Sequence, residues 1–385
     1  MMRDWELEEY RRKHVPLFND NKMKLGVFGA NVSNMCAVTT AETSFVPNWP
    51  QNKHIGACMD RAGFELMLPV ARWRGFGGPS NFNGNCLETY TWAAALAAVT
   101  EKPMLVSTSH VSTTHPIVAA KQAVTIDHVS NGRFAINVVC GWFSPEMEMF
   151  SGKQPPRLHR YEHAAEWTEI VLKLWQEDEE FDFEGKYFHI KKGWAQPKPV
   201  QRPRPVLINA GASEEGREYA AKYADFNFIM FDSLDDARFL IQDARERASR
   251  YGRQVGSFCN GYVICRETEQ EAKDYFDYYV REKGDVIAVD NIIRILGMES
   301  ASMTQQQLNN IRERFIAGWG GYPLIGTPEQ VAEGLKTLSQ TGFDGCVLSW
   351  VDFNAEFPMF EERVLPLLEQ MGLRNGNRST LDSTA

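Results

Sequence analysis

The clearest candidate for chemistry in this sequence is a run of small residues placed directly before a predicted helix. Residues 209–213 read NAGAS, and an amphipathic helix is predicted over Glu214–Ala224. Small side chains let backbone N–H groups approach a ligand, and the positive end of the helix points to the same place. The pattern is typical of an anion site suited to a phosphate. The alternative is an ordinary capped turn between a strand and a helix.

Further polar or aromatic residues lie at or just after the ends of three predicted strands. In chain order they are Arg72 with the glycine-rich stretch Gly75–Gly78, Thr108 with His110, and Asn137 with Trp142. Parallel strands in a barrel carry their active sites at their carboxyl ends, so these residues are candidates for one site. A buried amide such as Asn137 needs hydrogen-bond partners. The glycines alone are a weaker signal, because glycine-rich turns are common.

Several familiar chemistries have no matching motif. His110 and His115 have no nearby cluster of Asp, Glu or His at ligand spacing, and HExxH is absent, so the sequence predicts no metal site. No GxSxG, no Walker motif and no GxGxxG after the first strand occur. A serine hydrolase, a P-loop enzyme and a Rossmann dehydrogenase are therefore not supported.

The candidate residues are set in a regular alternation of short apolar runs and longer amphipathic stretches. Strands are predicted at Lys24–Phe28, Phe64–Val70, Met104–Val111, Arg133–Val139, Pro205–Asn209, Asn227–Phe231, Gly261–Cys265 and Gly345–Trp350. Helices are predicted at Asn52–Gly63, Cys86–Thr100, Pro116–Val129, Tyr161–Gln176, Glu214–Ala224, Ser233–Tyr251, Thr327–Thr341 and Pro358–Met371. This alternation implies an α/β fold with a parallel sheet. About eight units, with the last strand near the C-terminus, favour a TIM-like (β/α)₈ barrel over an open sheet.

Two segments break the alternation. Asp182–His189 carries Gly185 between aromatic residues, which predicts a small hairpin. Residues 282–321 form a long insertion before the last βα unit. Such an insertion is either a mobile lid over the C-terminal face of the barrel or a helical excursion packed against its wall. No domain-length linker is visible, so we expect a single barrel domain over residues 1–385.

The bulk properties are those of an ordinary globular protein of 385 residues, 43% hydrophobic and 24% charged. The formal net charge of −9 argues against a nucleic-acid or anionic-membrane partner. No run of about 18 apolar residues predicts a membrane span. The seven cysteines form no CxxC pair, and the charged N-terminus lacks the apolar region of a secretory signal. We therefore expect a cytoplasmic protein.

Longer stretches resemble one known family. Ala119–Phe150, Arg160–Trp167, Gln196–Asp225 and Leu324–Leu335 look like segments of luciferase-type flavin monooxygenases, in the same order. The resemblance covers about residues 23–372. Within the family, Arg72–Gly78 and Asn137–Trp142 are most similar to the pyrimidine-ring-opening monooxygenases, and sulfone monooxygenases are the next neighbours.

The resemblance implies a (β/α)₈ barrel that binds FMN at its C-terminal face, with specific residues in contact with it. Ala71 and Arg72 would border the flavin, Asn137 would hydrogen-bond to its ring, and Glu146 would also line the site. Arg160, Tyr161 and Ser213 would hold the phosphate, where the NAGAS pattern already predicts an anion. A small oxygen pocket would be formed by Leu68, Thr108, Asn137 and Trp142.

Most of these residues also have a simpler interpretation without the family. Leu68 and Trp142 would be packing residues, Thr108 would satisfy the backbone, and Arg72 would be a surface charge. The loop Gly29–Phe45 mixes features of the pyrimidine and sulfone groups, and His110 and Thr113–His115 differ from the pyrimidine pattern. These positions would touch the substrate, so both substrate classes stay open.

By resemblance, the protein is an FMNH₂-dependent, two-component monooxygenase. Its cosubstrates would be reduced FMN and O₂, and a separate NAD(P)H:flavin reductase would supply the reduced FMN. The substrate would be a small molecule: a cyclic amide or N-heterocycle that is ring-opened, or a sulfone that undergoes C–S cleavage. We also expect a homo-oligomer, either a dimer or a tetramer. The alternatives are an F420-dependent hydride-transfer oxidoreductase and a non-catalytic flavin-binding protein.

Overall fold

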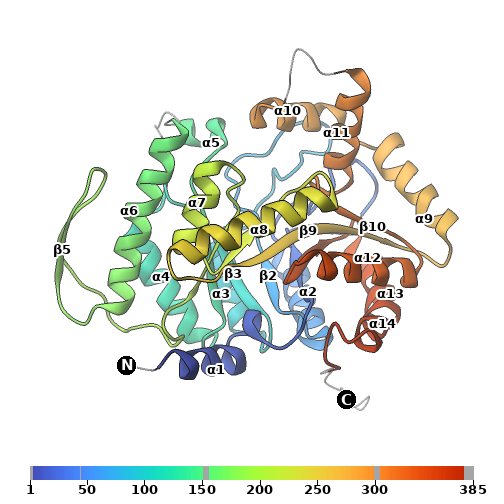
Figure 1. The fold of residues 1–385 in the computed structure, drawn as a ribbon. Coiled ribbons are helices and arrows are strands. Elements are labelled where there is room, and N and C mark those ends of the chain that lie inside the picture. Colours follow the sequence, from blue (N-terminus) through green and yellow to red (C-terminus); the bar gives the residue numbers. More distant parts are fainter. Residues whose placement is uncertain (1–2, 44, 151–155, 299–303, 377–385) are drawn as a thin grey trace.

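Eight parallel strands form the centre of the protein and close into a barrel (Figure 1). The computed structural model describes residues 3–43, 45–150, 156–298 and 304–376. The barrel strands are β1 (Lys24–Phe28), β2 (Leu66–Leu68), β3 (Met104–His110), β4 (Phe134–Val139), β7 (Val206–Asn209), β8 (Phe226–Phe228), β9 (Gly256–Cys265) and β11 (Gly345–Ser349). Each pairs in parallel with the next, and β11 closes the ring by pairing with both β9 and β1. The predicted TIM-like barrel is confirmed.

The outer layer consists of helices that follow the strands. They are α2 (Trp49–Ala62), α3 (Thr89–Ala97), α4 (Pro116–Val129), α6 (Arg157–Gln176), α7 (Glu214–Tyr223), α8 (Leu234–Arg250), α12 (Pro328–Thr341), α13 (Phe353–Met359) and α14 (Leu365–Gln370). Local signals start several of them: Ser213, Ser233 and Thr327 each accept a hydrogen bond from a first-turn N–H. Helices were therefore predicted to within a few residues wherever a cap and an apolar stripe coincided.

Several predicted boundaries differ from the structure. The second strand is limited to Leu66–Leu68 instead of Phe64–Val70, and the strand predicted at Gly261–Cys265 begins at Gly256. The last helix starts before Pro358, because Asp352 caps a helix at Phe353, and a π-helical turn over Phe360–Val364 joins it to α14. Pro358 lies inside α13, where it cannot donate a backbone hydrogen bond to the preceding turn, and the π-helical turn follows directly after that helix.

The N-terminal segment covers the amino end of the barrel. It comprises α1 (Asp4–His14) and a 3₁₀ turn at Pro16–Phe18. Val15 and Leu17 are buried against barrel-interior residues such as Val106. In Figure 1 this segment lies at the opposite end of the molecule from α10 and α11. The amino end is thus filled by apolar side chains.

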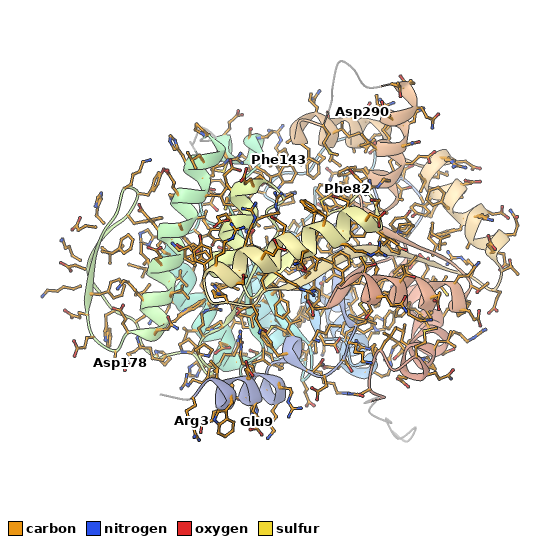
Figure 2. The ribbon with its side chains drawn as sticks, viewed as in Figure 1. Arg3, Glu9, Phe82, Phe143, Asp178 and Asp290 are labelled. Atoms are coloured by element: carbon orange, nitrogen blue, oxygen red, sulfur yellow. The ribbon has the colours of Figure 1, made fainter. Side chains whose placement is uncertain are left out.

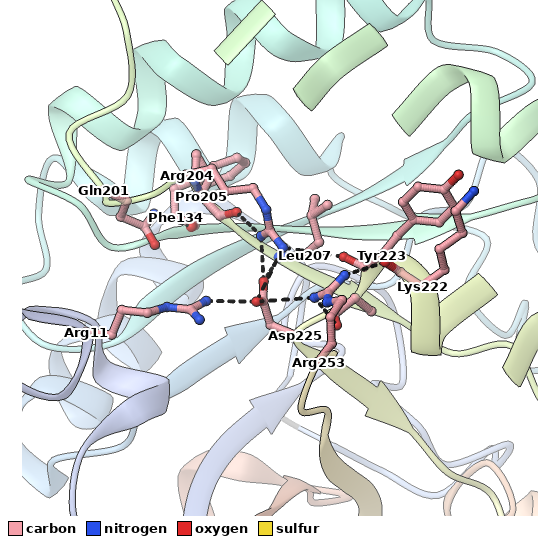
Figure 3. A network of polar contacts seen from close by, with 11 residues as sticks. Arg11, Phe134, Gln201, Arg204, Pro205, Leu207, Lys222, Tyr223, Asp225 and Arg253 are labelled. Atoms are coloured by element: carbon pink, nitrogen blue, oxygen red, sulfur yellow. Dashed lines mark hydrogen bonds and ion pairs between the residues drawn. The ribbon is translucent and has the colours of Figure 1, made fainter. Parts of the chain in front are cut away.

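A buried charge network fixes α1 to the barrel (Figure 3). Asp225, just before β8, accepts hydrogen bonds from Arg11 of α1 at 2.8 Å and from Arg204, before β7, at 2.6 Å. Arg253 lies 3.9 Å away and the backbone N–H of Leu207 donates at 2.9 Å. The Asp225 carboxylate is therefore compensated on several sides, which a buried charge requires.

The insertion before the last unit consists of α10 (Val286–Leu296) and α11 (Gln305–Gly318). The excursion begins before the predicted residue 282, with α9 (Glu269–Phe276) and a π-helical turn at Asp277–Glu282. It ends with β10 (Tyr322–Gly326), a strand that the sequence analysis missed and that pairs only with β9, outside the closed ring.

The glycine-rich stretch after β2 contacts this insertion. A side chain on Gly78 would collide with the carboxylate of Asp285, which caps α10 and accepts hydrogen bonds from the Ser80 N–H and hydroxyl. Gly78 also has a left-handed backbone, with φ of 73°. The glycine is therefore needed for close packing of two loops.

Two smaller segments complete the fold. The predicted hairpin is present as antiparallel strands β5 (Phe181–Glu184) and β6 (His189–Gly193), on the outside of the barrel. A short helix, α5 (Ser144–Met149), follows β4. In the part of the chain that the structure describes, no helix is both long and apolar enough to cross a membrane.

Candidate active site

One deep cavity of about 900 Å³ opens at the carboxyl end of the barrel. That volume suits a cofactor-sized ligand together with a small molecule. The predicted site residues that line it are Leu68, Ala71, Arg72, Thr108, Asn137, Trp142, Arg160, Tyr161 and Ser213. They come from loops and strand ends far apart in sequence, which the closed barrel brings to one place.

Thr108 and Asn137 form a hydrogen-bonded pair at the strand ends. They are opposite each other in the register of β3 and β4, and both are buried. The Asn137 Nδ2 donates to Thr108 Oγ1 at 3.2 Å, and the Thr108 hydroxyl donates to the carbonyl of Pro69 at 2.8 Å. The Asn137 Oδ1 has no partner among the described residues. A buried amide oxygen without a partner is costly, which indicates that a ligand donor satisfies it.

An aromatic cluster flanks this pair. Leu68 ends β2 and is buried, while Trp142 follows β4 and stacks against Phe76 at 6.1 Å between ring centroids. Phe76 also stacks on Phe82 and Phe143, which Figure 2 shows at the end of the molecule nearest α10. Leu68 and Trp142 thus present apolar surface to the cavity beside two polar side chains.

Arg72 is buried beside this cluster and is not the surface charge of the simpler interpretation. Its guanidinium lies 4.8 Å from the Trp142 ring and 5.1 Å from that of Phe76. Its Nη1 lies 3.9 Å from the Glu146 carboxylate, and its Nε has no partner among the described residues. Burial lowers the pKa of Arg72, and Glu146 opposes that shift.

Glu146 is placed differently from the expectation that it lines the site. It is not among the residues that line the cavity, and its carboxylate accepts hydrogen bonds from the backbone N–H groups of Trp73 at 2.7 Å and Arg74 at 3.4 Å. Burial raises the pKa of Glu146, while the Arg72 charge lowers it. Glu146 therefore holds the loop that carries Arg72 in place, from the side of the loop away from the cavity.

The opposite end of the cavity has the chemistry of an anion site. The NAGAS residues line it, and Ser213 caps α7 by accepting from the N–H of Gly216 at 3.2 Å. Arg160 donates to the carbonyl of Gly141, and its Nε has no partner among the described residues. A cation, a helix N-terminus and small residues thus converge, as anion binding requires.

The Tyr161 hydroxyl lies close to two glycines, Gly211 of this loop and Gly216 in α7. A Cβ added to Gly211 would lie 2.6 Å from the Tyr161 hydroxyl oxygen, and one added to Gly216 would lie 2.5 Å from it. The hydroxyl also contacts the Ser213 side chain, and burial raises the pKa of Tyr161 to about 12. The tyrosine is a neutral hydrogen-bonding group at the anion end.

Two groups of lining residues were not given a catalytic or cofactor-binding role in the sequence analysis. His110 lies one pleat beyond Thr108 on β3 and is buried at the cavity. Burial, together with the Arg72 charge, lowers the pKa of His110 to about 3, so it is a neutral imidazole. The insertion contributes Ile295, Leu296, Phe315 and Trp319. The position of His110 at the end of a predicted strand indicated that it could lie at the site. No local sequence pattern indicated that residues of the insertion line the cavity.

These observations can be tested against a flavin mononucleotide. Its phosphate requires cations and N–H donors, which Arg160 and the start of α7 present. Its ring offers both donors and acceptors, which fits the unpartnered Asn137 Oδ1 and Arg72 Nε at the other end. The residues present therefore fit FMN: Arg160 and the start of α7 could take the phosphate, and Asn137 Oδ1 and Arg72 Nε could bond to the ring.

A closed parallel barrel with one ligand cavity at its carboxyl end defines a (β/α)₈ enzyme architecture. The model of the luciferase-like monooxygenase family matches residues 23–345 of this chain, and the chain belongs to that family. Members of the family are flavin-dependent, two-component monooxygenases.

Named relatives support the same assignment. The chain is 31% identical to a pyrimidine monooxygenase RutA of Acinetobacter baylyi, over 90% of this chain and 95% of the relative. It is 29% identical to an FMNH(2)-dependent dimethylsulfone monooxygenase of Pseudomonas putida, over 91% and 96%. Long-chain alkane monooxygenase LadA has the same fold, with a TM-score of 0.83 at 21% identity over 93% and 94% of the two chains.

Proposed function

We propose that this protein uses reduced FMN and O₂ to oxygenate a small organic molecule in the barrel cavity. One observation supports this proposal most: a single cavity joins the anion site formed by Arg160 and the start of α7 to the unpartnered Oδ1 of Asn137, beside a patch of apolar side chains. When bound, reduced FMN supplies the electrons that activate O₂; the protein binds, orients and shields.

Arg160, Tyr161 and Ser213 bind the phosphate in this proposal. The guanidinium supplies charge, the tyrosine hydroxyl supplies a hydrogen bond, and Ser213 places the N-terminus of α7. Ala71, Arg72 and Asn137 border the flavin ring, and Glu146 acts through Arg72 and its loop.

Leu68, Thr108, Asn137 and Trp142 enclose the oxygen. Thr108 holds the Asn137 amide, so that Asn137 presents a fixed polar group to the reacting atoms. Leu68 and Trp142 exclude water, which protects an oxygenating site from unproductive decay. His110 is neutral and presents a hydrogen-bonding ring to the substrate.

The substrate is a cyclic amide or N-heterocycle that is ring-opened, or a sulfone that undergoes C–S cleavage. The two kinds of relative support both classes. A separate NAD(P)H-dependent reductase supplies reduced FMN, and the chain forms a homo-oligomer. The described residues of the 282–321 insertion act as a lid, through Ile295, Leu296, Phe315 and Trp319 at the cavity.

The test is oxygen consumption by the purified protein with reduced FMN and a panel of cyclic amides, N-heterocycles and sulfones. We expect oxygenated product from at least one class, with hydrogen peroxide counted separately as uncoupled oxygen. Hydride transfer with F420 and no oxygen uptake would replace the proposal with the deazaflavin alternative. FMN binding without any turnover would favour a flavin-binding protein.

A further inference from the structure

Trp319 has a backbone conformation that bulky side chains avoid. It ends α11 with φ of 55° and ψ of 40°, in the left-handed region. This position after a helix is usually glycine, because a Cβ is strained there. Glycines flank it at 318, 320 and 321, and the turn has two consecutive left-handed residues: Gly320, with φ of 70°, and Trp319, where the sequence has a tryptophan instead of a glycine. Strain of this kind persists only where the surroundings enforce it.

The surroundings of Trp319 are aromatic. Its ring centroid lies 5.5 Å from that of Phe76, 5.8 Å from that of Phe82 and 6.3 Å from that of Trp142. The Phe82 ring is nearly parallel to the indole, at an interplanar angle of 30°. Trp319, Phe82 and Trp142 all line the cavity. They form a wall of flat rings, to which the barrel and the insertion both contribute.

The turn that carries Trp319 is tied directly to the barrel. Asn260 of β9 donates to the carbonyls of Gly318 at 3.3 Å and Trp319 at 3.4 Å. Arg314 donates to the carbonyls of Phe231, after β8, and Gly320. The backbone that carries the indole is therefore anchored on both sides, to β9 through Asn260 and to the segment after β8 through Arg314.

The charged residues of the cavity limit the kinds of ligand that can stack against the rings of Trp319, Phe82 and Trp142. Among the described residues that line the cavity, the charged side chains are Arg72 and Arg160, and none is a carboxylate. If Arg160 binds the FMN phosphate, Arg72 is the other cation among these lining residues; it would border the flavin ring next to Trp142, at the end of the cavity where a substrate would meet that ring. This environment favours a ring that carries carbonyl or ring-nitrogen acceptors over a cationic molecule.

From these observations we infer that Trp319 is a specificity-determining residue, which selects planar, acceptor-bearing ring substrates by stacking. The inference rests on the proposed function, because it concerns the substrate end of the same cavity. Stacking on a fixed aromatic face discriminates by shape, since a puckered or tetrahedral molecule loses most of the face-to-face contact. Of the two substrate classes, it selects the planar heterocycle.

The test compares planar and saturated ring pairs on FMN-loaded protein. The pairs are uracil with dihydrouracil and 2-pyridone with piperidin-2-one, which are all neutral near pH 7, and titration calorimetry gives the ratio of dissociation constants in each pair. We expect the wild type to prefer the planar member. Trp319→Gly fits the left-handed backbone while removing the ring, so it should reduce that preference at least about ten-fold. Trp319→Phe should restore part of it.

Lys192→Gly is the matched control, because Lys192 also has a positive φ of 50° but lies exposed on the outer hairpin. It should leave the planar preference and FMN affinity unchanged. No planar preference in the wild type, or an equal preference in Trp319→Gly, would overturn the inference. A selective loss of FMN affinity in Trp319→Gly would also overturn it, by making Trp319 a flavin-binding residue. Failure to bind FMN or consume oxygen would instead count against the proposed function.

Discussion

At the scale of single residues, the most informative group is the unpartnered oxygen of Asn137. The Asn137 amide is fixed by Thr108, and the Thr108 hydroxyl is in turn committed to the carbonyl of Pro69. This chain of hydrogen bonds orients the amide and leaves its Oδ1 without a partner among the described residues, at the cavity. Thr108 thus has a positioning role in addition to any direct contact with oxygen.

We predict that Thr108→Ala reduces oxygenation about 10²-fold, because the loss of one aimed hydrogen bond near developing charge has an effect of that size. FMN affinity should change little, since Thr108 is remote from the anion end. The measurement is product formed per reduced FMN consumed, with hydrogen peroxide counted as leak. Full product yield and rate in this variant would show that oxygen is activated elsewhere.

Arg160 gives a prediction about the cofactor. Removal of a charge-assisted hydrogen bond to a phosphate costs about 1.5–3 kcal/mol, so Arg160→Ala should weaken FMN binding by roughly ten- to a hundred-fold. Fluorescence titration of FMN gives the dissociation constant, and riboflavin, which lacks the phosphate, is the control ligand. Riboflavin affinity should be nearly the same in both proteins. A parallel loss for both ligands would place Arg160 at the ring.

At the scale of elements, the loop from β7 to α7 depends on the absence of side chains. A Cβ on Gly211 would lie only 2.6 Å from the Tyr161 hydroxyl oxygen and 2.7 Å from the Cα atom of Gly216. Two packed elements, α6 and α7, approach each other there. The loop therefore requires glycine for its contact with Tyr161, independently of any ligand.

Gly211→Ala should accordingly displace Tyr161 and weaken FMN binding by at least about ten-fold, the effect of losing roughly one hydrogen bond. The comparison variant is Gly252→Ala, at the end of α8, where φ is 65° and no atom lies within 4 Å of the added Cβ. That change strains the backbone and lowers Tm without touching the site. Equal effects of both variants on FMN affinity would contradict a specific role for the loop.

At the scale of the whole molecule, the Asp225 network couples the N-terminal helix to two barrel strands. Burial alone would raise the pKa of the Asp225 carboxyl, but Arg204 and Arg11 outweigh it and hold that pKa well below its ordinary value. A carboxyl with a lowered pKa contributes stability that is fully present above the ordinary value of about 3.9. This contribution is lost as the pH falls through the pKa of the folded protein.

Asp225→Asn leaves the guanidinium groups of Arg204 and Arg11 buried without their counter-charge. We expect a loss of about 3–5 kcal/mol in the free energy of unfolding at pH 7. The difference from wild type should shrink as the pH falls below about 4. Urea unfolding at several pH values measures both effects. Asp235→Asn, in an exposed pair with Arg238, should change little, and a similar loss in both variants would rule out a special contribution of the network.

The local sequence determined the repeating elements and much of the site. The helix Pro116–Val129 and the strand Lys24–Phe28 were predicted to the residue, because apolar period, proline and capping are properties of neighbouring residues. Strand ends also located Thr108, Asn137 and the NAGAS loop, since a parallel barrel brings strand ends to one face. The family resemblance added Arg160 and Tyr161, which lie on a helix and carry no local signal of their own.

Only the tertiary structure decided which side chains face the cavity and which support them. Arg72 lines the cavity, whereas Glu146 contacts Arg72 and its loop without lining the cavity, although the side chains of both are buried. This difference arises because the loops after β2 and β4 pack against each other. The aromatic wall depends on the return of Trp319 from an insertion about 180 residues after Trp142. Contacts between residues so far apart in sequence depend on how the loops pack, and loop packing produces no periodic pattern in the sequence. The left-handed backbone conformation of Trp319 is likewise seen only in the folded structure.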